Sequence, residues 1–271
     1  MNTLSLQKRA QILGLLVEGN SMRAITRLVG CSINTVTALL IDVGQACSAY
    51  QDKAMRNLPS KRIQCDEIWS FCYSKEKNVS AEDKGVLGHG DVYTWTSICP
   101  DTKLVPSFMV GKRDAEYAHA FIQDLASRLA NRVQLTTLVK HYSNPGEAQQ
   151  AQKRYSPSEF VSAEKRRISG DPDVKKVSTS HVERQNLTMR MGMRRFTRLT
   201  NGFSKKIENL EHAVALHFMF YNFGRIHKTL RVTPAMEAGI SDHVWTLEEI
   251  AALVPEPVAT KRGSYKTKNS N

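Results

Sequence analysis

Three strand-like segments lie close together between residues 61 and 110, and they restrict the folds available to this chain of 271 residues. Residues 61–73 and 92–99 are rich in aromatic and apolar side chains, and a polar loop separates them. A turn at residues 100–103 leads directly into the third segment, residues 104–110. Apolar runs bounded by turn residues are typical of consecutive paired strands, so we expect a β-meander here.

A helix and a fourth strand follow the meander. Asp114 is placed to cap a helix that runs to Ala130 with apolar side chains on one face, and residues 133–137 have the composition of a strand. Three strands, a helix and another strand form the opening order of the ribonuclease-H-like fold. We therefore expect residues 61–240 to form an α/β (α+β) domain with a mixed sheet.

The first 49 residues predict three short helices. Ser21 and Ser32 can each cap a helix, and Gly30 supplies a tight turn before the third helix, which we expect to end near Gly44. Two helices joined by such a turn form the helix-turn-helix pattern, although a plain three-helix bundle has the same signature. The third helix carries polar residues near its start, where such helices meet base edges, namely Asn34, Thr35 and Thr37.

The remaining segments are less distinctive. Residues 50–60 have the composition of a linker, and residues 138–177 give no clear pattern. From Ser180 the chain is helical again, with a strongly apolar helix at residues 213–222. Residues 241–271 predict a short helix, which begins with a capping box of Thr246 and Glu249, and then a basic tail.

The formal net charge of +12 is concentrated in two segments. Residues 184–231 hold ten Lys or Arg against two Glu, and residues 255–271 add a net +3. A basic surface this dense favours a polyanion, because the release of counterions from nucleic acid drives such association. The alternative is a solvated basic helix face with a polar tail.

Composition excludes several other classes of protein. Five cysteines without a C-x-x-C pair argue against a disulfide framework or a zinc ribbon and favour a reducing compartment. No apolar run approaches the roughly 18 residues of a membrane span, and the first nine residues lack a signal pattern. We therefore expect a cytoplasmic protein that acts on nucleic acid and not at a membrane.

Two carboxylates lie where a purely structural role explains them poorly. Asp66 is inside an apolar strand, where a charge is costly unless an arginine or a metal ion compensates it. Glu183 lies at the start of a late helix, where a capping box would also explain it. At 100° per residue, however, Asn186, Arg190 and Arg194 fall within about 60° of Glu183. A carboxylate that leads a stripe of Asn and Arg suits a metal-bound phosphate.

With these residues in place, the sequence resembles the DDE transposases, nearest to those of the insertion-sequence-one group. The resemblance rests on motifs in order: CDEIW around Asp66, STSHVERQNLTMR around Glu183, RRFTRLT at residues 194–200, and a C-terminal signature from Tyr221 to Pro234. It covers most of the chain, from the N-terminal helices to about Gly239.

The resemblance implies a ribonuclease-H-like core in which three carboxylates hold two Mg²⁺ or Mn²⁺ ions that cleave and join DNA. Asp66 would be the first carboxylate, bridging both ions, and Glu183 the third. The resemblance also implies a helix-turn-helix on the terminal repeats of a mobile element, and homo-oligomers on double-stranded DNA. Besides the polar residues of the third helix, the expected DNA contacts are Asn186, Arg190, Arg194, Arg195, Arg198, Lys205, Lys206 and Arg225.

The second carboxylate of the family pattern is missing. The family carries Thr-Thr-Asp-Gly directly after its fourth strand, whereas Thr137 is followed here by Leu138 and a strand-like run without a crossover helix. The simplest explanation is an internal deletion of roughly two dozen residues. The domain would then be incomplete after its fourth strand and damaged around residues 138–160, with weak metal binding and little or no cleavage.

Two functions therefore remain open. The first is an insertion-sequence transposase with impaired catalysis. The second is a DNA-binding transposase remnant that occupies element ends without chemistry and represses transposition. An ordinary helix-turn-helix transcription factor would explain residues 1–49 but neither Asp66 nor the stripe that follows Glu183.

Overall fold

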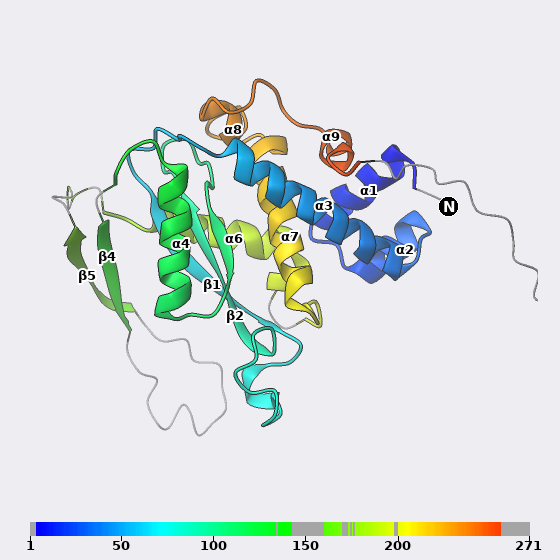
Figure 1. Ribbon diagram of the computed structural model, residues 1–271, viewed down its shortest axis with the longest axis horizontal. Helices are drawn as coiled ribbons and strands as arrows, with labels where there is room; N and C mark the ends of the chain where they lie inside the picture. Colours follow the sequence, from blue (N-terminus) through cyan, green and yellow to red (C-terminus); the bar gives the residue numbers. More distant parts are fainter. Residues whose placement is uncertain are drawn as a thin grey trace, which may run out of the picture.

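The structure is a computed structural model that describes residues 4–133, 135–142, 160–169, 173, 175, 177–197 and 200–255. Its described strands form a three-stranded sheet and a separate two-stranded sheet. Some of the helices pack against the larger sheet, and the N-terminal and C-terminal helices pack against one another beside it (Figure 1). The expected mixture of helices and strands is thus confirmed. Within the described residues, no single helix has both the length and the hydropathy to span a membrane. Only the bent pair of helices at residues 22–29 and 33–54 meets both criteria when the two helices are taken together.

Three capped helices open the chain. They are α1 (Leu6–Val17), α2 (Met22–Val29) and α3 (Ile33–Ala54), and α2 and α3 are bent by 110° about their connection. The side chain of Ser21 accepts a 3.1 Å hydrogen bond from the backbone N–H of Ala24, and Ser32 accepts one of 3.0 Å from Thr35. Gly30 adopts the left-handed conformation, with φ 66°, and ends α2. The predicted caps and turn are therefore confirmed.

The end of α3 differs from the prediction. Gly44 does not stop the helix but marks its closest approach to α7 (Ile207–Met219), since a Cβ at this position would lie 2.4 Å from the Cβ of His212. Residues 50–54 of the expected linker are helical, and Met55 just beyond them is fully buried. The N-terminal helices consequently share one hydrophobic core with the rest of the described chain.

The meander is confirmed by strands β1 (Gln64–Cys72), β2 (Gly90–Ile98) and β3 (Phe108–Gly111), which pair antiparallel in that order. A short 3₁₀ turn, η1 (Glu76–Asn78), lies in the loop after β1. The third strand begins at Phe108 and not at residue 104. Asp66 lies opposite Thr96 in the register, so these two side chains share a face of the sheet.

Helices cover both faces of this sheet. The predicted helix α4 (Ala115–Arg128) is capped by Asp114, whose carboxylate accepts a 2.9 Å hydrogen bond from the backbone N–H of Tyr117. Phe121 of α4 contacts the ring of Trp95, which lies on the face opposite Thr96. The face of Asp66 and Thr96 is covered instead by α6 (Ser180–Gly192), and Figure 1 shows the two helices on either side of β1 and β2.

The second sheet departs from the expected arrangement. Strand β4 (Leu135–Tyr142) covers both the predicted fourth strand and the run after it, and it pairs antiparallel with β5 (Phe160–Ser169). The described strands therefore form no mixed sheet: every pairing among them is antiparallel, and β4 does not join β1. Strands that pair antiparallel, as β4 and β5 do, need no crossover helix between them. This agrees with the absence of a crossover helix after Thr137 in the sequence.

The chain after α6 is helical, as expected. It contains η3 (Arg194–Phe196), α7, the π-helical turn η4 (Phe220–Gly224), α8 (Pro234–Glu237) and α9 (Leu247–Ala252). The predicted capping box is confirmed at α9, where Thr246 and Glu249 exchange side-chain to backbone hydrogen bonds of 2.7 and 3.2 Å. Helix α9 packs against α1, where the guanidinium of Arg9 donates to the carbonyl of Ala251 at 2.6 Å.

Candidate functional site

Two polar side chains of β1 attach α6 to the sheet. The side-chain carbonyl of Gln64 accepts hydrogen bonds from the backbone N–H groups of His181 (2.9 Å) and Val182 (3.2 Å). Two residues further along β1, the carboxylate of Asp66 accepts a 2.9 Å hydrogen bond from the side-chain amide of Asn186. Residues two apart in a strand point to the same face, so α6 runs along the face that carries Asp66.

This attachment brings the predicted carboxylates to one side of the sheet. Glu183 precedes Asn186 by three residues, and side chains at this spacing are neighbours on a helix surface. Because Asn186 contacts Asp66 directly, the first turns of α6 hold Glu183 close to the strand that carries Asp66. Glu183 is exposed and Asp66 is partly buried.

The predicted capping box at the start of α6 is not formed. Thr179, and not Ser180, is the N-cap, and its side chain makes no capping hydrogen bond to the backbone. The hydroxyl of Thr179 donates to the carboxylate of Glu183 at 2.6 Å. From outside the helix, Gln64 accepts hydrogen bonds from the backbone N–H groups of His181 and Val182 in the first turn. Capping by its own helix therefore does not explain Glu183.

Asn186 is the site residue with an unsatisfied atom. Its side chain is 9% exposed, and its carbonyl oxygen Oδ1 is buried without a hydrogen-bond partner, although such atoms are normally paired. Two carboxylates and an amide oxygen form an all-oxygen donor set of the kind that Mg²⁺ and Mn²⁺ prefer. Asp66, Glu183 and Asn186 thus fit a divalent ion chemically. The described residues contain no cluster of three or more His, Cys, Asp or Glu suited to hold a metal.

The position of the missing carboxylate lies inside a strand. Thr137 and Leu138 are in the middle of β4, opposite Arg166 and Lys165 of β5, and not at a strand end beside Asp66. Asp173 is exposed and accepts a 3.0 Å hydrogen bond from the backbone N–H of Lys175. Most of the region that we expected to be damaged, residues 143–159, lies outside the described residues.

The predicted stripe along α6 ends earlier than expected. Asn186 and the half-buried Arg190 lie on α6, but the helix stops at Gly192. Arg194 is in η3, and with Arg195 it lines a small pocket between the α1–α2 turn, α3 and α7. The segment that follows Glu183 therefore separates its cations: Arg190 lies on the helix that contacts Asp66, and Arg194 and Arg195 lie at the N-terminal helices.

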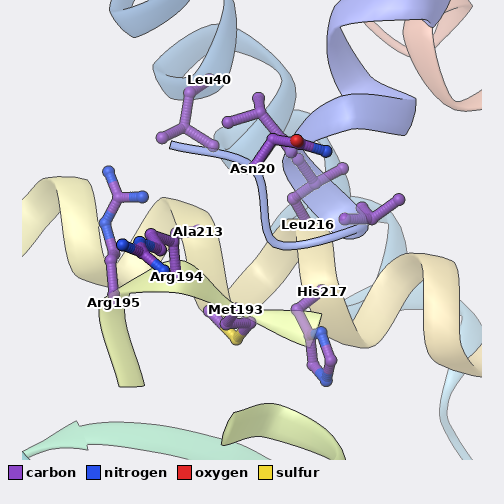
Figure 2. Close-up of a pocket in the computed structure, with 10 residues that line it drawn as sticks. Asn20, Leu40, Met193, Arg194, Arg195, Ala213, Leu216 and His217 are labelled. Carbon is purple, nitrogen blue, oxygen red and sulfur yellow. The ribbon is translucent and has the colours of Figure 1, made fainter. Parts of the chain in front are cut away.

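Arg195, which is partly exposed, is held in this pocket by a short hydrogen bond. Its Nε donates to the hydroxyl of Ser204 at 2.6 Å. Burial lowers the pKa of its guanidinium to about 10, so the group remains cationic at neutral pH. Figure 2 shows Arg194 and Arg195 beside Ala213 of α7, with the ring of His217 at the other end of the same pocket.

The other predicted DNA contacts are scattered over the surface. Asn34 is exposed, whereas the hydroxyls of Thr35 and Thr37 bond locally, to Ser32 Oγ at 2.8 Å and to the Ile33 carbonyl at 2.9 Å. Three of the predicted basic residues are exposed: Lys205, Lys206 and Arg225. Arg198 lies outside the described residues.

The C-terminal signature has a structural role that sequence reasoning did not assign. The amide of Asn222, fully buried, accepts from the backbone N–H of Val105 and donates to its carbonyl, both at 3.0 Å. The hydroxyl of Tyr221 donates to the carbonyl of Lys103 at 3.0 Å. Together they fix the segment that precedes β3. Burial, followed by the nearby Lys103 and Arg225, lowers the pKa of His227 in the same signature.

Sequence reasoning also missed Gln64, although a signal was present. Gln64 and Asp66 are polar residues at alternate positions of the strand, which indicates a polar partner on that face. The residues that the structure brings together are therefore Gln64, Asp66, Glu183 and Asn186, with Arg194 and Arg195 in a separate pocket.

Comparison of the chain with protein-family models, with curated proteins and with solved structures finds no match.

Proposed function

We propose that the protein binds double-stranded DNA as a relative of the DDE transposases, with cleavage and strand transfer that are weak or absent. The hydrogen bond between Asn186 and Asp66 is the observation that carries the proposal. It places the first carboxylate of the family motif next to the helix that carries the last one, as the resemblance requires.

The arrangement of the elements supports the same proposal. An antiparallel meander, a helix on one face and α6 on the other agree with the opening of a ribonuclease-H-like domain. The 110° bend between α2 and α3 falls within the range of helix-turn-helix motifs, about 90–120°. The exposed Asn34 at the start of α3 then lies where a recognition helix meets base edges.

Asp66, Glu183 and the Oδ1 atom of Asn186 would hold a divalent ion. When bound, such an ion would act as a Lewis acid on a phosphodiester oxygen and would lower the pKa of a bound water. The protein itself contributes orientation: Asn186 fixes the rotamer of Asp66, and Thr179 fixes that of Glu183. With two carboxylates in place of three, we expect weak affinity for Mg²⁺ or Mn²⁺.

Binding and cleavage are best tested with one protein sample. We would select duplexes bound by the full-length chain from a random library, because no terminal repeat is assigned, and then incubate the selected duplex with Mn²⁺. We expect a gel shift that weakens in Asn34→Ala and stays unchanged in Lys84→Gln, a substitution of an exposed loop residue. Failure to enrich any duplex would overturn the proposal.

The second candidate is a DNA-binding remnant without chemistry that represses transposition. It is favoured by the described part of the chain, which brings no third carboxylate to Asp66 and Glu183. Binding without cleavage in the experiment above supports this candidate. Cleavage that disappears in Asp66→Asn supports the transposase. This variant places an amide of nearly the same shape where the carboxylate was, so it removes the charge and keeps the size of the side chain. The expected homo-oligomer on DNA remains a prediction.

A further inference from the structure

The pocket beside Arg194 and Arg195 lies at a junction of four segments. It is lined by the end of α1 and the turn after it, by Leu40 of α3, by residues 193–195 and by α7. Its volume is ≈ 20 Å³, which is close to the space that one water molecule requires. The pocket therefore admits one or two oxygen atoms of a ligand but neither a sugar nor a base.

The two arginines bring positive charge into this pocket without a carboxylate. Neither Arg194 nor Arg195 forms an ion pair among the described residues, and Arg195 bonds only the neutral hydroxyl of Ser204. Desolvation lowers the pKa of Arg195, and the Cys72 thiol opposes this effect in part. Both guanidinium groups are partly exposed, so an anion from solution can reach them, and charge-assisted hydrogen bonds to such an anion are the strong ones.

The backbone around the arginines is tightly held. Gly202 packs against Arg194, since a Cβ on residue 202 would lie 2.7 Å from the Arg194 carbonyl oxygen. Gly19, with φ 74° in the α1–α2 turn, packs against the end of α6, where its Cβ would lie 3.1 Å from the carbonyl oxygen of Met191. The arginines are thus presented by a rigid junction, which reduces the entropic cost of ligand binding.

The surroundings favour phosphate as the anion that this pocket would bind. Ser204, the partner of Arg195, is followed directly by the exposed Lys205 and Lys206, so positive charge extends from the pocket onto the surface. Guanidinium groups match the geometry of phosphate oxygens, and a polymer of phosphates also uses the flanking lysines. We propose that Arg194 and Arg195 form a pocket that binds one backbone phosphate of DNA at the junction of the N-terminal helices with α6 and α7. The proposal rests on the DNA binding proposed above.

The site is distinct from the one at Asp66. The nine residue steps from Glu183 to Gly192 span about 14 Å of helix axis at 1.5 Å per residue. The pocket therefore contacts a phosphate away from the carboxylates and fixes the duplex relative to them, and does not hold the phosphate near Asp66 as the stripe had suggested.

The test is the salt dependence of DNA binding by the full-length protein and its variants. The slope of log K against log salt decreases by about 0.9 for each phosphate of duplex DNA that a variant no longer neutralises. We expect that decrease in Arg194→Gln and in Arg195→Met, and no change in Lys84→Gln, which removes one charge from an exposed loop. If the wild-type protein binds DNA and all slopes agree, the pocket is overturned while DNA binding stands. If the wild-type protein binds no DNA, both proposals fail.

A second measurement separates a binding role from a structural one. Arg195→Met removes a partly buried charge that has no carboxylate partner among the described residues, so the Tm of the free variant should equal or exceed that of the wild type. A structural Arg195 would instead lower Tm when replaced. Inorganic phosphate identifies the remaining alternative: if it raises the Tm of the wild type but not of Arg194→Gln, while the salt slopes stay equal, the occupant is a free anion and the assignment to DNA is overturned.

Discussion

Asn186 donates a 2.9 Å hydrogen bond to Asp66 across a separation of 120 residues in the sequence. The bond joins the second turn of α6 to the third residue of β1, next to the Gln64 side chain that binds the first turn. Two polar contacts thus set both the position and the rotation of α6 on the sheet. The stability of the fold and the geometry of the candidate site depend on the same pair of strand residues.

Replacing Gln64 should weaken this attachment. Gln64→Leu removes the acceptor of two backbone N–H groups at the start of α6, and we expect it to lower the free energy of unfolding by about 1–3 kcal/mol. Urea denaturation would measure the loss. The matched variant Gln64→Glu keeps an acceptor at a helix N-terminus, where negative charge is favourable, and should be closer to the wild type. Equal losses in both variants would contradict this role.

Asn186→Asp should strengthen the proposed metal site. The substitution places a third carboxylate beside Asp66, so without metal we expect a loss of roughly 1–3 kcal/mol from the broken hydrogen bond and like-charge repulsion. Mn²⁺ should restore the stability, and titration calorimetry should show tighter binding than in the wild type. The control is the swap Asp66→Asn with Asn186→Asp, which restores one amide and one carboxylate. Unchanged Mn²⁺ affinity in Asn186→Asp would exclude Asn186 as a ligand position.

Gly44→Ala should disrupt the contact between α3 and α7. The added Cβ would overlap the backbone and Cβ of His212, at 2.4–2.7 Å, so the helices must separate, which typically costs about 1–3 kcal/mol. Gly14→Ala is the matched control in α1, because its Cβ would meet only the flexible end of Leu247, at 3.0 Å. We expect Gly14→Ala to be close to neutral, helped by the higher helix propensity of alanine. A neutral Gly44→Ala would show that the two helices do not pack so closely.

His217 should make stability depend on pH. Burial, followed by the charge of Arg225, lowers the pKa of its imidazole to about 3, while the unfolded chain titrates near 6.5. Between these values the unfolded state binds a proton that the folded state does not, so stability is complete above pH 6.5 and falls as the pH decreases towards 3. His217→Gln should flatten this dependence in urea denaturation across that range. His119→Gln, at an exposed position of α4, should leave it unchanged.

Local signals were enough to predict much of the fold. The side chains of Ser32, Asp114 and Thr246 cap helices where expected, because a cap depends on a few neighbouring residues. The end of α3 could not be predicted in this way. Glycine usually ends a helix, and only the distant His212 reveals that Gly44 is required for close packing. Strand β5 was missed because its sequence, FVSAEKRRIS, is mostly polar and lacks the apolar pattern of a core strand.

The candidate site was predicted only in part, because local signals identify single residues but not the contacts between distant segments. Asp66 stood out because a charge inside an apolar strand demands a partner, and that partner proved to be Asn186 of the predicted stripe. Arg194 was assigned to the same face by extending helical periodicity beyond Gly192, where the helix ends. Periodicity cannot show where a helix stops, and the pocket at Arg194 and Arg195 depends on segments far away in the sequence, including the α1–α2 turn.

The glycine at position 44 also limits how such a chain can evolve. Proteins often acquire a new binding specificity by exchanging a whole recognition module at a flexible joint. Here α3 continues through the expected linker and shares its core with α7. An N-terminal segment taken from another protein would therefore lack a surface that fits His212. Change is confined to single substitutions on exposed positions such as Asn34, which leave the buried contact intact. The proposed recognition surface can therefore change in small steps, whereas its exchange as a unit would disrupt the contact between α3 and α7.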